Sequence, residues 1–276
     1  MTTNAVKLFF ISILLFACTP NVATRTKNSA ALATQNNFQP KYVKGGDFVL
    51  TTYQRITDKN LPYVFYIEGD GHISEKYAAV SDNPTPLTTM LLQLAIMDNR
   101  PNIVYIARPC QYTPLELNPK CNSNRYWVEK RIGKEVVDSI DDVINNITNG
   151  QKFSLVGFSG GGGVAVMVAV NNKNVKDIIT IAGNLDTVTF DNTHNGRGYL
   201  SHSFNPIDYA KQVNNIPQLH LSGAGDKRVP PFIAERYVEV SNSPCVKQKV
   251  LPNTTHIKGW ETIWPSLLKI DINCDR

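Results

Sequence analysis

Several features that would direct this chain to other classes of protein are missing from its sequence. It has no run of Lys and Arg: its 28 basic and 23 acidic residues are scattered and leave a net charge of +5. Proteins that bind nucleic acid usually concentrate positive charge on one surface, so no nucleic acid partner is expected. The cysteines lack the Cys-x-x-Cys spacing typical of structural zinc, and no metal or other cofactor is expected.

Low-complexity and strongly disordered segments are also missing. The chain has 276 residues, of which 42% are hydrophobic and 18% are charged, as in ordinary globular proteins. This length is sufficient for one large domain with a sizeable core, and no internal repeat or second domain boundary is visible. We therefore expect a single folded domain over residues 47–276, preceded by two segments of different character.

The first of these segments, residues 1–18, resembles an export signal. Lys7 precedes a stretch over residues 8–17 that is apolar except for Ser12 and is too short to span a bilayer as a helix. The stretch ends in Leu-Phe-Ala-Cys at Cys18, which resembles the lipobox of bacterial lipoproteins, where the cysteine is acylated and becomes the new N-terminus. The alternative is an ordinary signal peptide that is cut elsewhere. The lipobox predicts an exported protein, anchored by its N-terminal lipid to a membrane of the bacterial cell envelope and facing the periplasm or the exterior.

The second segment, residues 19–46, has the composition of a linker. It is rich in Thr, Asn, Ala and Gln and contains few large apolar side chains. Such segments bury too little apolar surface to fold by themselves. We expect a flexible tether between the membrane and the domain.

The remaining cysteines suit an oxidising compartment. Without Cys18, the chain has four: Cys110, Cys121, Cys245 and Cys274. An even number in an exported protein indicates disulfides. Three pairings are possible, and we favour the sequence-local one, which joins Cys110 to Cys121 and Cys245 to Cys274.

Short apolar runs alternate with helical patterns from residue 47 onward, which predicts a mostly parallel sheet with helices on both faces. The helical patterns are an apolar segment over residues 87–97 and a period of three to four residues that starts at Val128 and stops at Asn149 and Gly150. The predicted strands are residues 48–53, 63–67, 103–107, 153–157, 178–182, 219–222 and 246–251.

A Gly-x-Ser-x-Gly motif at residues 157–161 follows one of these strands and precedes an apolar run. A serine on a sharp turn from strand to helix needs small neighbours so that the two backbones can pass closely, and Gly157 and Gly161 meet this need. The turn would direct the backbone N–H of Gly160 toward an oxyanion formed at Ser159. The motif therefore makes Ser159 a candidate nucleophile.

Two other interpretations of the motif remain. Residues 160–165 also fit the Gly-x-Gly-x-x-Ala pattern of a dinucleotide loop, in which Asp186 would hold a ribose. That loop would lie far from a leading βαβ unit, no P-loop Lys follows it, and a downstream Asp and His would stay unexplained. The motif can also be a plain glycine-rich turn.

A nucleophilic serine needs a base, and the base needs an acid that fixes its tautomer. Asp226 follows the strand predicted at 219–222, and His256 follows the strand predicted at 246–251. Because the carboxyl ends of parallel strands meet at one edge of a sheet, both can converge on Ser159 there. Asp186, after the strand predicted at 178–182, is an alternative acid.

The Gly-Phe-Ser-Gly-Gly motif, the Gly-Asp-Lys-x-Val-Pro motif and the late His, in this order, resemble the α/β-hydrolase superfamily of lipases, esterases and thioesterases. The resemblance covers roughly residues 47–270. It implies an α/β fold with a small cap insert and a serine hydrolase with nucleophile Ser159, acid Asp226 and base His256, acting on a small-molecule ester or thioester.

The resemblance also assigns a second oxyanion N–H to the loop after an earlier strand. Gly69, Asp70 and Gly71 lie in that loop, and the neighbouring His72 is a candidate for substrate contact. Residues 184–204 lack periodicity and form the expected cap. A peptidase on the same fold and a hydrolase-fold protein that binds without turnover are the alternative functions.

Overall fold

The structure is a computed structural model that describes residues 20–74, 80–194 and 200–274. Within these ranges no helix is both long and apolar enough to cross a membrane. The predicted export signal and Cys18 lie outside the described residues, as does the stretch 195–199 of the expected cap.

An eight-stranded mixed sheet forms the centre of the described fold, in the order β1-β2-β4-β3-β5-β6-β7-β8. β1 and β2 run antiparallel at one edge, β4 pairs antiparallel with β2, and the strands from β4 through β3 to β8 are parallel. All seven predicted strands are confirmed within a few residues at each end. The bounds are β1 Gln39–Gly45, β2 Phe48–Ile56, β3 Tyr63–Ile67, β4 Asn102–Ile106, β5 Phe153–Phe158, β6 Val175–Ile181, β7 Gln218–Gly223 and β8 Val246–Leu251.

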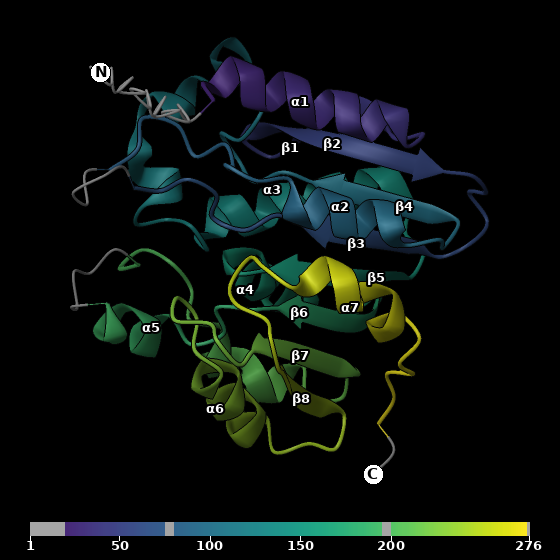
Figure 1. The fold of residues 1–276 in the computed structure, drawn as a ribbon, viewed down its shortest axis with the longest axis vertical. Helices are drawn as coiled ribbons and strands as arrows, with labels where there is room; N and C mark the ends of the chain where they lie inside the picture. The colour runs from purple at the N-terminus through teal and green to yellow at the C-terminus, as the bar shows by residue number, and fades with distance from the viewer. Residues whose placement is uncertain (1–19, 75–79, 195–199, 275–276) are drawn as a thin grey trace, which may run out of the picture.

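Helices cover both faces of this sheet, which confirms the predicted fold class. Successive side chains of β3 alternate between two apolar clusters, with Phe65 in one and Tyr66 in the other. The first cluster includes side chains of α3, α4 and α6, and the second includes side chains of α1, α2 and α7; α2 and α7 cross the near side of the sheet in Figure 1. The bounds are α1 Val22–Gln35, α2 Met90–Met97, α3 Lys134–Thr148, α4 Gly160–Asn171, α5 Thr187–Thr193, α6 Phe232–Ser241 and α7 Trp260–Leu267.

The expected flexible tether is wrong over the residues that the structure describes. Asn21 caps α1 by accepting a hydrogen bond from the Thr24 N–H at 2.8 Å, and β1 extends the sheet beside β2. The composition misled the prediction because the helix packs through the small side chains of Ser29 and Ala33, which let it approach the domain closely. Phe38, 1% exposed, then anchors the connection to β1. The folded unit therefore begins at residue 22, ahead of the predicted boundary at 47.

The amphipathic pattern that starts at Val128 predicts a helix that begins too early in the sequence. α3 begins at Lys134 because Gly133, with φ −75° and ψ 163°, has an extended backbone. Asn149, at φ 50°, ends α3 in the left-handed conformation at the predicted place. The turns before α3 carry side chains into the site described below.

Two disulfides confirm the predicted pairing. Cys110 is bonded to Cys121 and Cys245 to Cys274, with S–S distances of 2.01 and 2.03 Å. The first staples the loop after β4, and the second ties the C-terminal segment to the start of β8. Disulfides of this kind persist in oxidising compartments, as expected of an extracellular or periplasmic protein.

Candidate active site

Ser159 stands between β5 and α4 in a strained turn. Its backbone has φ 53° and ψ −121°, which is rare for a residue with a side chain. Hydrogen bonds on both sides hold it there: its N–H donates to the Ile181 carbonyl at 2.9 Å, and its carbonyl accepts from the N–H groups of Asn184 at 2.9 Å and Gly162 at 3.0 Å. The turn projects the hydroxyl beyond the carboxyl edge of the sheet.

Glycines on both sides make this turn possible. A Cβ on Gly157 would lie 2.4 Å from the Gly161 carbonyl oxygen, and a Cβ on Gly161 would lie 2.3 Å from the Ile67 carbonyl oxygen. Neither position has room for a methyl group, because backbone atoms cannot move aside cheaply. The sequence argument for Gly157 and Gly161 therefore agrees with the packing.

His256 and Asp226 reach Ser159 from the ends of two other strands. The distance from His256 Nε2 to Ser159 Oγ is 3.1 Å, and the distance from His256 Nδ1 to Asp226 Oδ2 is 2.8 Å. Since an ionised carboxylate only accepts, the proton on Nδ1 is donated to Asp226, which leaves Nε2 free to accept from the serine hydroxyl. All three residues are at most 8% exposed.

The loop after β7 fixes the other oxygen of Asp226. Oδ1 accepts hydrogen bonds from the backbone N–H groups of Arg228 at 2.8 Å and Val229 at 2.9 Å. These bonds hold the carboxylate in its orientation toward His256. Together they define a Ser159, His256 and Asp226 chain of contacts.

Asp186, the alternative acid, has other partners. Its carboxylate caps α5 by accepting from the Thr189 N–H at 3.0 Å and the Thr189 hydroxyl at 2.7 Å, and it accepts from Arg236 Nε at 2.9 Å. Burial alone would raise its pKa, but these hydrogen bonds outweigh burial and lower it. The structure thus places Asp186 with Thr189 and Arg236, and Asp226 with His256.

Some backbone N–H groups of the loop after β3 already donate a hydrogen bond within the protein, and others do not. Gly69 donates to Glu68 Oε1 at 2.9 Å, and His72 donates to the Pro84 carbonyl at 3.0 Å. The N–H groups of Asp70 and Gly71 have no acceptor within the described part of the chain. Gly160, the first residue of α4, likewise has no partner for its N–H inside the helix.

Comparison with known proteins supports the architecture. No family model matches the sequence, and no curated protein matches it. Solved structures do match: an acylaminoacyl peptidase of Pyrococcus horikoshii over 87% of this chain, with a TM-score of 0.59 and 15% identity. An esterase of Pyrococcus furiosus matches over 85% of this chain, with a TM-score of 0.59 and 11% identity. Est1E from Butyrivibrio proteoclasticus matches over 83% of this chain, with a TM-score of 0.59 and 13% identity. The chain has the α/β-hydrolase fold.

The matches differ in how much of the other protein they cover. The chain spans 42% of the acylaminoacyl peptidase and 38% of a puromycin-hydrolysing peptidase of Mycobacterium tuberculosis. It spans 90% of the Pyrococcus furiosus esterase and 96% of Est1E. At these identities the likeness concerns the fold alone, so the chemistry must be argued from the site.

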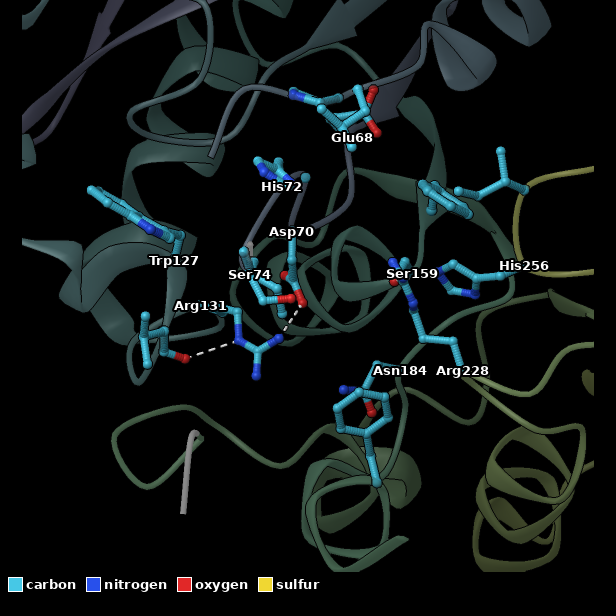
Figure 2. A pocket seen from close by; sticks show the side chains of 18 of the residues that line it. Glu68, Asp70, His72, Ser74, Trp127, Arg131, Ser159, Asn184, Arg228 and His256 are labelled. Carbon is cyan, nitrogen blue, oxygen red and sulfur yellow. Dashed lines mark hydrogen bonds and ion pairs between the residues drawn. The ribbon is translucent and has the colours of Figure 1, made fainter. Parts of the chain in front are cut away.

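A cavity of about 570 Å³ opens beside Ser159 at the position where an α/β-hydrolase fold receives its ligand. In Figure 2, Arg131 and Trp127 lie on the opposite side of Ser159 from His256. The part of the expected cap that the structure describes contributes to the lining through α5. The apolar lining consists of Ile73, Val80, Pro86, Leu87, Trp127, Val128, Phe158, Phe190 and Ile257, and the charged or polar lining includes Glu68, Asp70, His72, Arg131, Asn184, Asp191, His194, Lys227 and Arg228.

Sequence reasoning missed the ion pairs around Asp70. Arg131 Nη1 lies 2.9 Å from Asp70 Oδ2, and Arg108 Nη1 lies 3.5 Å from Asp70 Oδ1. Both arginine side chains are buried, at 3% and 4% exposure. Their distance from Asp70 in the sequence hides the contact. In the structure the pairing fits the burial of both side chains, because Arg is rarely buried unless it is paired.

Glu68 directly precedes the loop after β3 that carries the candidate oxyanion donors, and its side chain is also buried. Its Oε2 accepts from the Tyr105 hydroxyl at 2.6 Å, and its Oε1 accepts from the Gly69 N–H. Burial raises the pKa of the Glu68 carboxyl to about 7, even though these hydrogen bonds favour the charged form. Glu68 thus changes charge near neutral pH next to the site.

Proposed function

We propose that the protein is a serine hydrolase that cleaves a carboxylic ester or thioester through an acyl-enzyme. The observation that carries this proposal is the pair of consecutive contacts from Ser159 to His256 and from His256 to Asp226. A plain glycine-rich turn does not require a base at 3.1 Å from the serine, nor an acid that fixes the tautomer of that base.

Acylation follows from this arrangement. Ser159 Oγ attacks the carbonyl carbon while its proton passes to His256 Nε2, and the charged imidazole is stabilised by Asp226. The tetrahedral intermediate then collapses, the bond from the carbonyl carbon to the leaving oxygen or sulfur breaks, and the leaving group takes the proton from Nε2. The acyl group remains on Ser159.

Deacylation uses the same residues in reverse. Water gives one proton to His256 Nε2 as its oxygen attacks the acyl carbon. The bond to Ser159 Oγ breaks, the serine oxygen recovers the proton from His256, and the acyl group leaves as a carboxylic acid. The cycle requires no redox partner, because every step transfers only protons and an acyl group.

The oxyanion that forms in both steps needs two hydrogen-bond donors. We assign them to the N–H groups of Gly160 and Asp70. Gly69 is a weaker candidate because its N–H already donates to Glu68, and Gly71 lies one residue further from β3, in a left-handed backbone conformation with φ +74°. Asp70 is also the residue whose side chain lies against Gly160.

Two arguments favour an ester or thioester over a peptide. This chain spans 90% of a protein described as an esterase and 96% of Est1E, but less than half of each of the two peptidases. Most of the surface that lines the cavity is also apolar, as an acyl group requires. A peptidase with the same triad is the second candidate, because the two peptidases match with TM-scores of 0.59 and 0.58, close to the 0.59 of the esterase and Est1E.

We further propose that the protein is a lipoprotein anchored through Cys18. The support is the apolar stretch that leads to Cys18 and the two disulfides, which suit an exported protein. Since α1 begins at Val22, only Thr19, Pro20 and Asn21 would separate the lipid from the folded domain. The anchor would therefore hold the domain against the membrane surface.

A substrate panel tests the reaction class. The exported protein should hydrolyse 4-nitrophenyl acyl esters or acyl thioesters and should not measurably hydrolyse the matching acyl 4-nitroanilides, which are amides. The Ser159→Ala variant should hydrolyse neither. Measurable cleavage of the amides that is lost in Ser159→Ala would favour the peptidase, and no cleavage of any substrate by folded protein would favour the binding protein.

A further inference from the structure

Arg131 presents one unused end of its guanidinium to the cavity. Its Nε donates to the Val128 carbonyl at 2.9 Å and its Nη1 contacts Asp70, so the side chain is held on two sides. Nη2 makes no hydrogen bond with any described residue, although the side chain is only 3% exposed and lines the cavity. Figure 2 shows these two bonds and the third nitrogen directed away from them.

The charges around Arg131 leave positive charge without a full counterpart. Two buried guanidiniums, Arg108 and Arg131, share the single Asp70 carboxylate. Glu68 is the next carboxyl, but its hydrogen bonds go to Tyr105 and Gly69, and its pKa of about 7 leaves it partly protonated at neutral pH. A buried positive charge without a complete partner favours a ligand with a negative charge.

Other polar groups line the cavity beside Arg131. Asn184 is 2% exposed, and its side-chain oxygen, an acceptor, makes no hydrogen bond within the described residues. Lys227 and Arg228 lie on the lining, and the described chain provides no carboxylate partner for either side chain. Asp191 is the remaining carboxylate on the lining, and it lies on α5. Lys227 and Arg228 thus add positive charge to the cavity that Arg131 lines.

We propose that the substrate carries a negatively charged group, either a carboxylate or a phosphate, in addition to the acyl bond that Ser159 attacks. Arg131 binds this charged group in the cavity. A guanidinium forms short, directional pairs with both anions, and its preset orientation through Asp70 and Val128 reduces the entropy lost on binding. The apolar walls beside it, including Trp127, would hold the intervening chain. The inference deepens the proposed function and rests on it for the identity of the attacked bond.

The ratio of kcat/KM for two esters tests the role of Arg131. We compare kcat/KM for the 4-nitrophenyl monoester of glutaric acid with that for 4-nitrophenyl butyrate, which lacks the terminal carboxylate. Wild type should prefer the glutarate ester by about tenfold to a hundredfold, the range for a hydrogen bond to a charged group. Arg131→Gln should bring the ratio close to one, and an unchanged ratio would overturn the assignment.

Two variants guard this result against damage to the fold. Arg131→Lys keeps a positive charge beside Asp70 but removes the second guanidinium nitrogen, so it should also lose most of the preference. Arg125→Gln removes an exposed arginine that pairs with Glu129 nearby, and it should keep the wild-type ratio. If Arg228→Gln lost the preference for the glutarate ester while both Arg131 variants kept it, the anion would bind at Arg228, and the proposal would be overturned.

Binding without turnover separates this inference from the proposed reaction. Calorimetry at fixed ionic strength should detect glutarate or inorganic phosphate binding to Ser159→Ala, and at least about tenfold weaker binding to Ser159→Ala/Arg131→Gln. Tighter glutarate binding identifies a carboxylate, and tighter phosphate binding identifies a phosphate. Absence of binding by both anions would overturn the inference, whereas Arg131-dependent binding in a protein without hydrolase activity would overturn only the proposed function.

Discussion

The Asp70 carboxylate lies directly against Gly160, the residue that follows the candidate nucleophile. A Cβ added to Gly160 would come within 2.0 Å of Asp70 Oδ1. The carboxylate is held in this position by Arg131 and Arg108. The two residues that we assign as oxyanion donors are therefore packed against each other, and the ion pairs fix their separation.

This contact predicts a specific effect of Gly160→Ala. The added methyl group would displace Asp70 and with it one oxyanion N–H, so we expect kcat/KM for an ester to fall by about a hundredfold to a thousandfold. Gly150→Ala is the control, because no atom lies within 4 Å of the added Cβ, and it should lower stability alone through its φ of +83°. Steady-state kinetics of both variants is the measurement, and wild-type turnover by Gly160→Ala would contradict the assignment.

The two candidate acids should respond oppositely to loss of charge. Asp226→Asn would let His256 adopt the wrong tautomer, so kcat should fall by about four orders of magnitude while the fold is kept. Asp186→Asn should change kcat little and instead lower the free energy of unfolding by about 1 kcal/mol, since it weakens the cap of α5 and the pair with Arg236. The reverse ranking in kinetics and denaturant unfolding would identify Asp186 as the acid.

Glu68 should make the stability of the protein depend on pH. Its pKa is raised from 4.5 to about 7 in the fold, so the folded state binds more protons than the unfolded state between these values. Stability must then fall as pH rises through this window, by roughly 3 kcal/mol in total. Denaturant unfolding at pH 5, 6, 7 and 8 measures it.

Glu68→Gln removes the titrating group. The free energy of unfolding of this variant, relative to that of wild type, should therefore fall toward pH 5 and rise toward pH 8. Glu116→Gln, at an exposed position, is the matched control and should follow wild type at every pH. A constant difference between wild type and Glu68→Gln would show that Glu68 titrates in its ordinary range.

The lipid anchor has its own test. Cys18→Ser keeps the apolar stretch but removes the sulfur that would be acylated, so the variant should be exported and should no longer partition with membranes. Fractionation of cells that express wild type or Cys18→Ser is the measurement. Membrane partitioning that is equal in both proteins would refute the lipoprotein proposal.

Local backbone requirements made the nucleophile turn predictable. Gly157 and Gly161 are needed within two residues of Ser159, and the buried strand before them is a short apolar run, so both signals lie in adjacent sequence. The approach of Asp226 and His256 followed from one rule, that parallel strands end at the same edge of the sheet. The disulfides joined cysteines that are near in sequence.

Contacts between distant segments could not be read in the same way. Arg108 and Arg131 meet Asp70 only because the loop after β4 and the turns before α3 fold over the same edge of the sheet. α1 packs through Ser29 and Ala33, and small side chains give no apolar periodicity that would reveal a buried face. β1 is a mostly exposed edge strand, which only its pairing with β2 identifies.

Covalent labelling of Ser159 tests the central claim most directly. An unassisted hydroxyl barely ionises at neutral pH, so only a serine paired with a base should react quickly with a small fluorophosphonate. Intact-protein mass spectrometry should show one adduct on folded wild type, none on Ser159→Ala and very slow labelling of His256→Ala. Because the triad acts as a unit, His256→Ala/Asp226→Asn should be scarcely slower than His256→Ala. A folded wild type that stays unlabelled, or that is labelled equally fast without His256, would contradict the account.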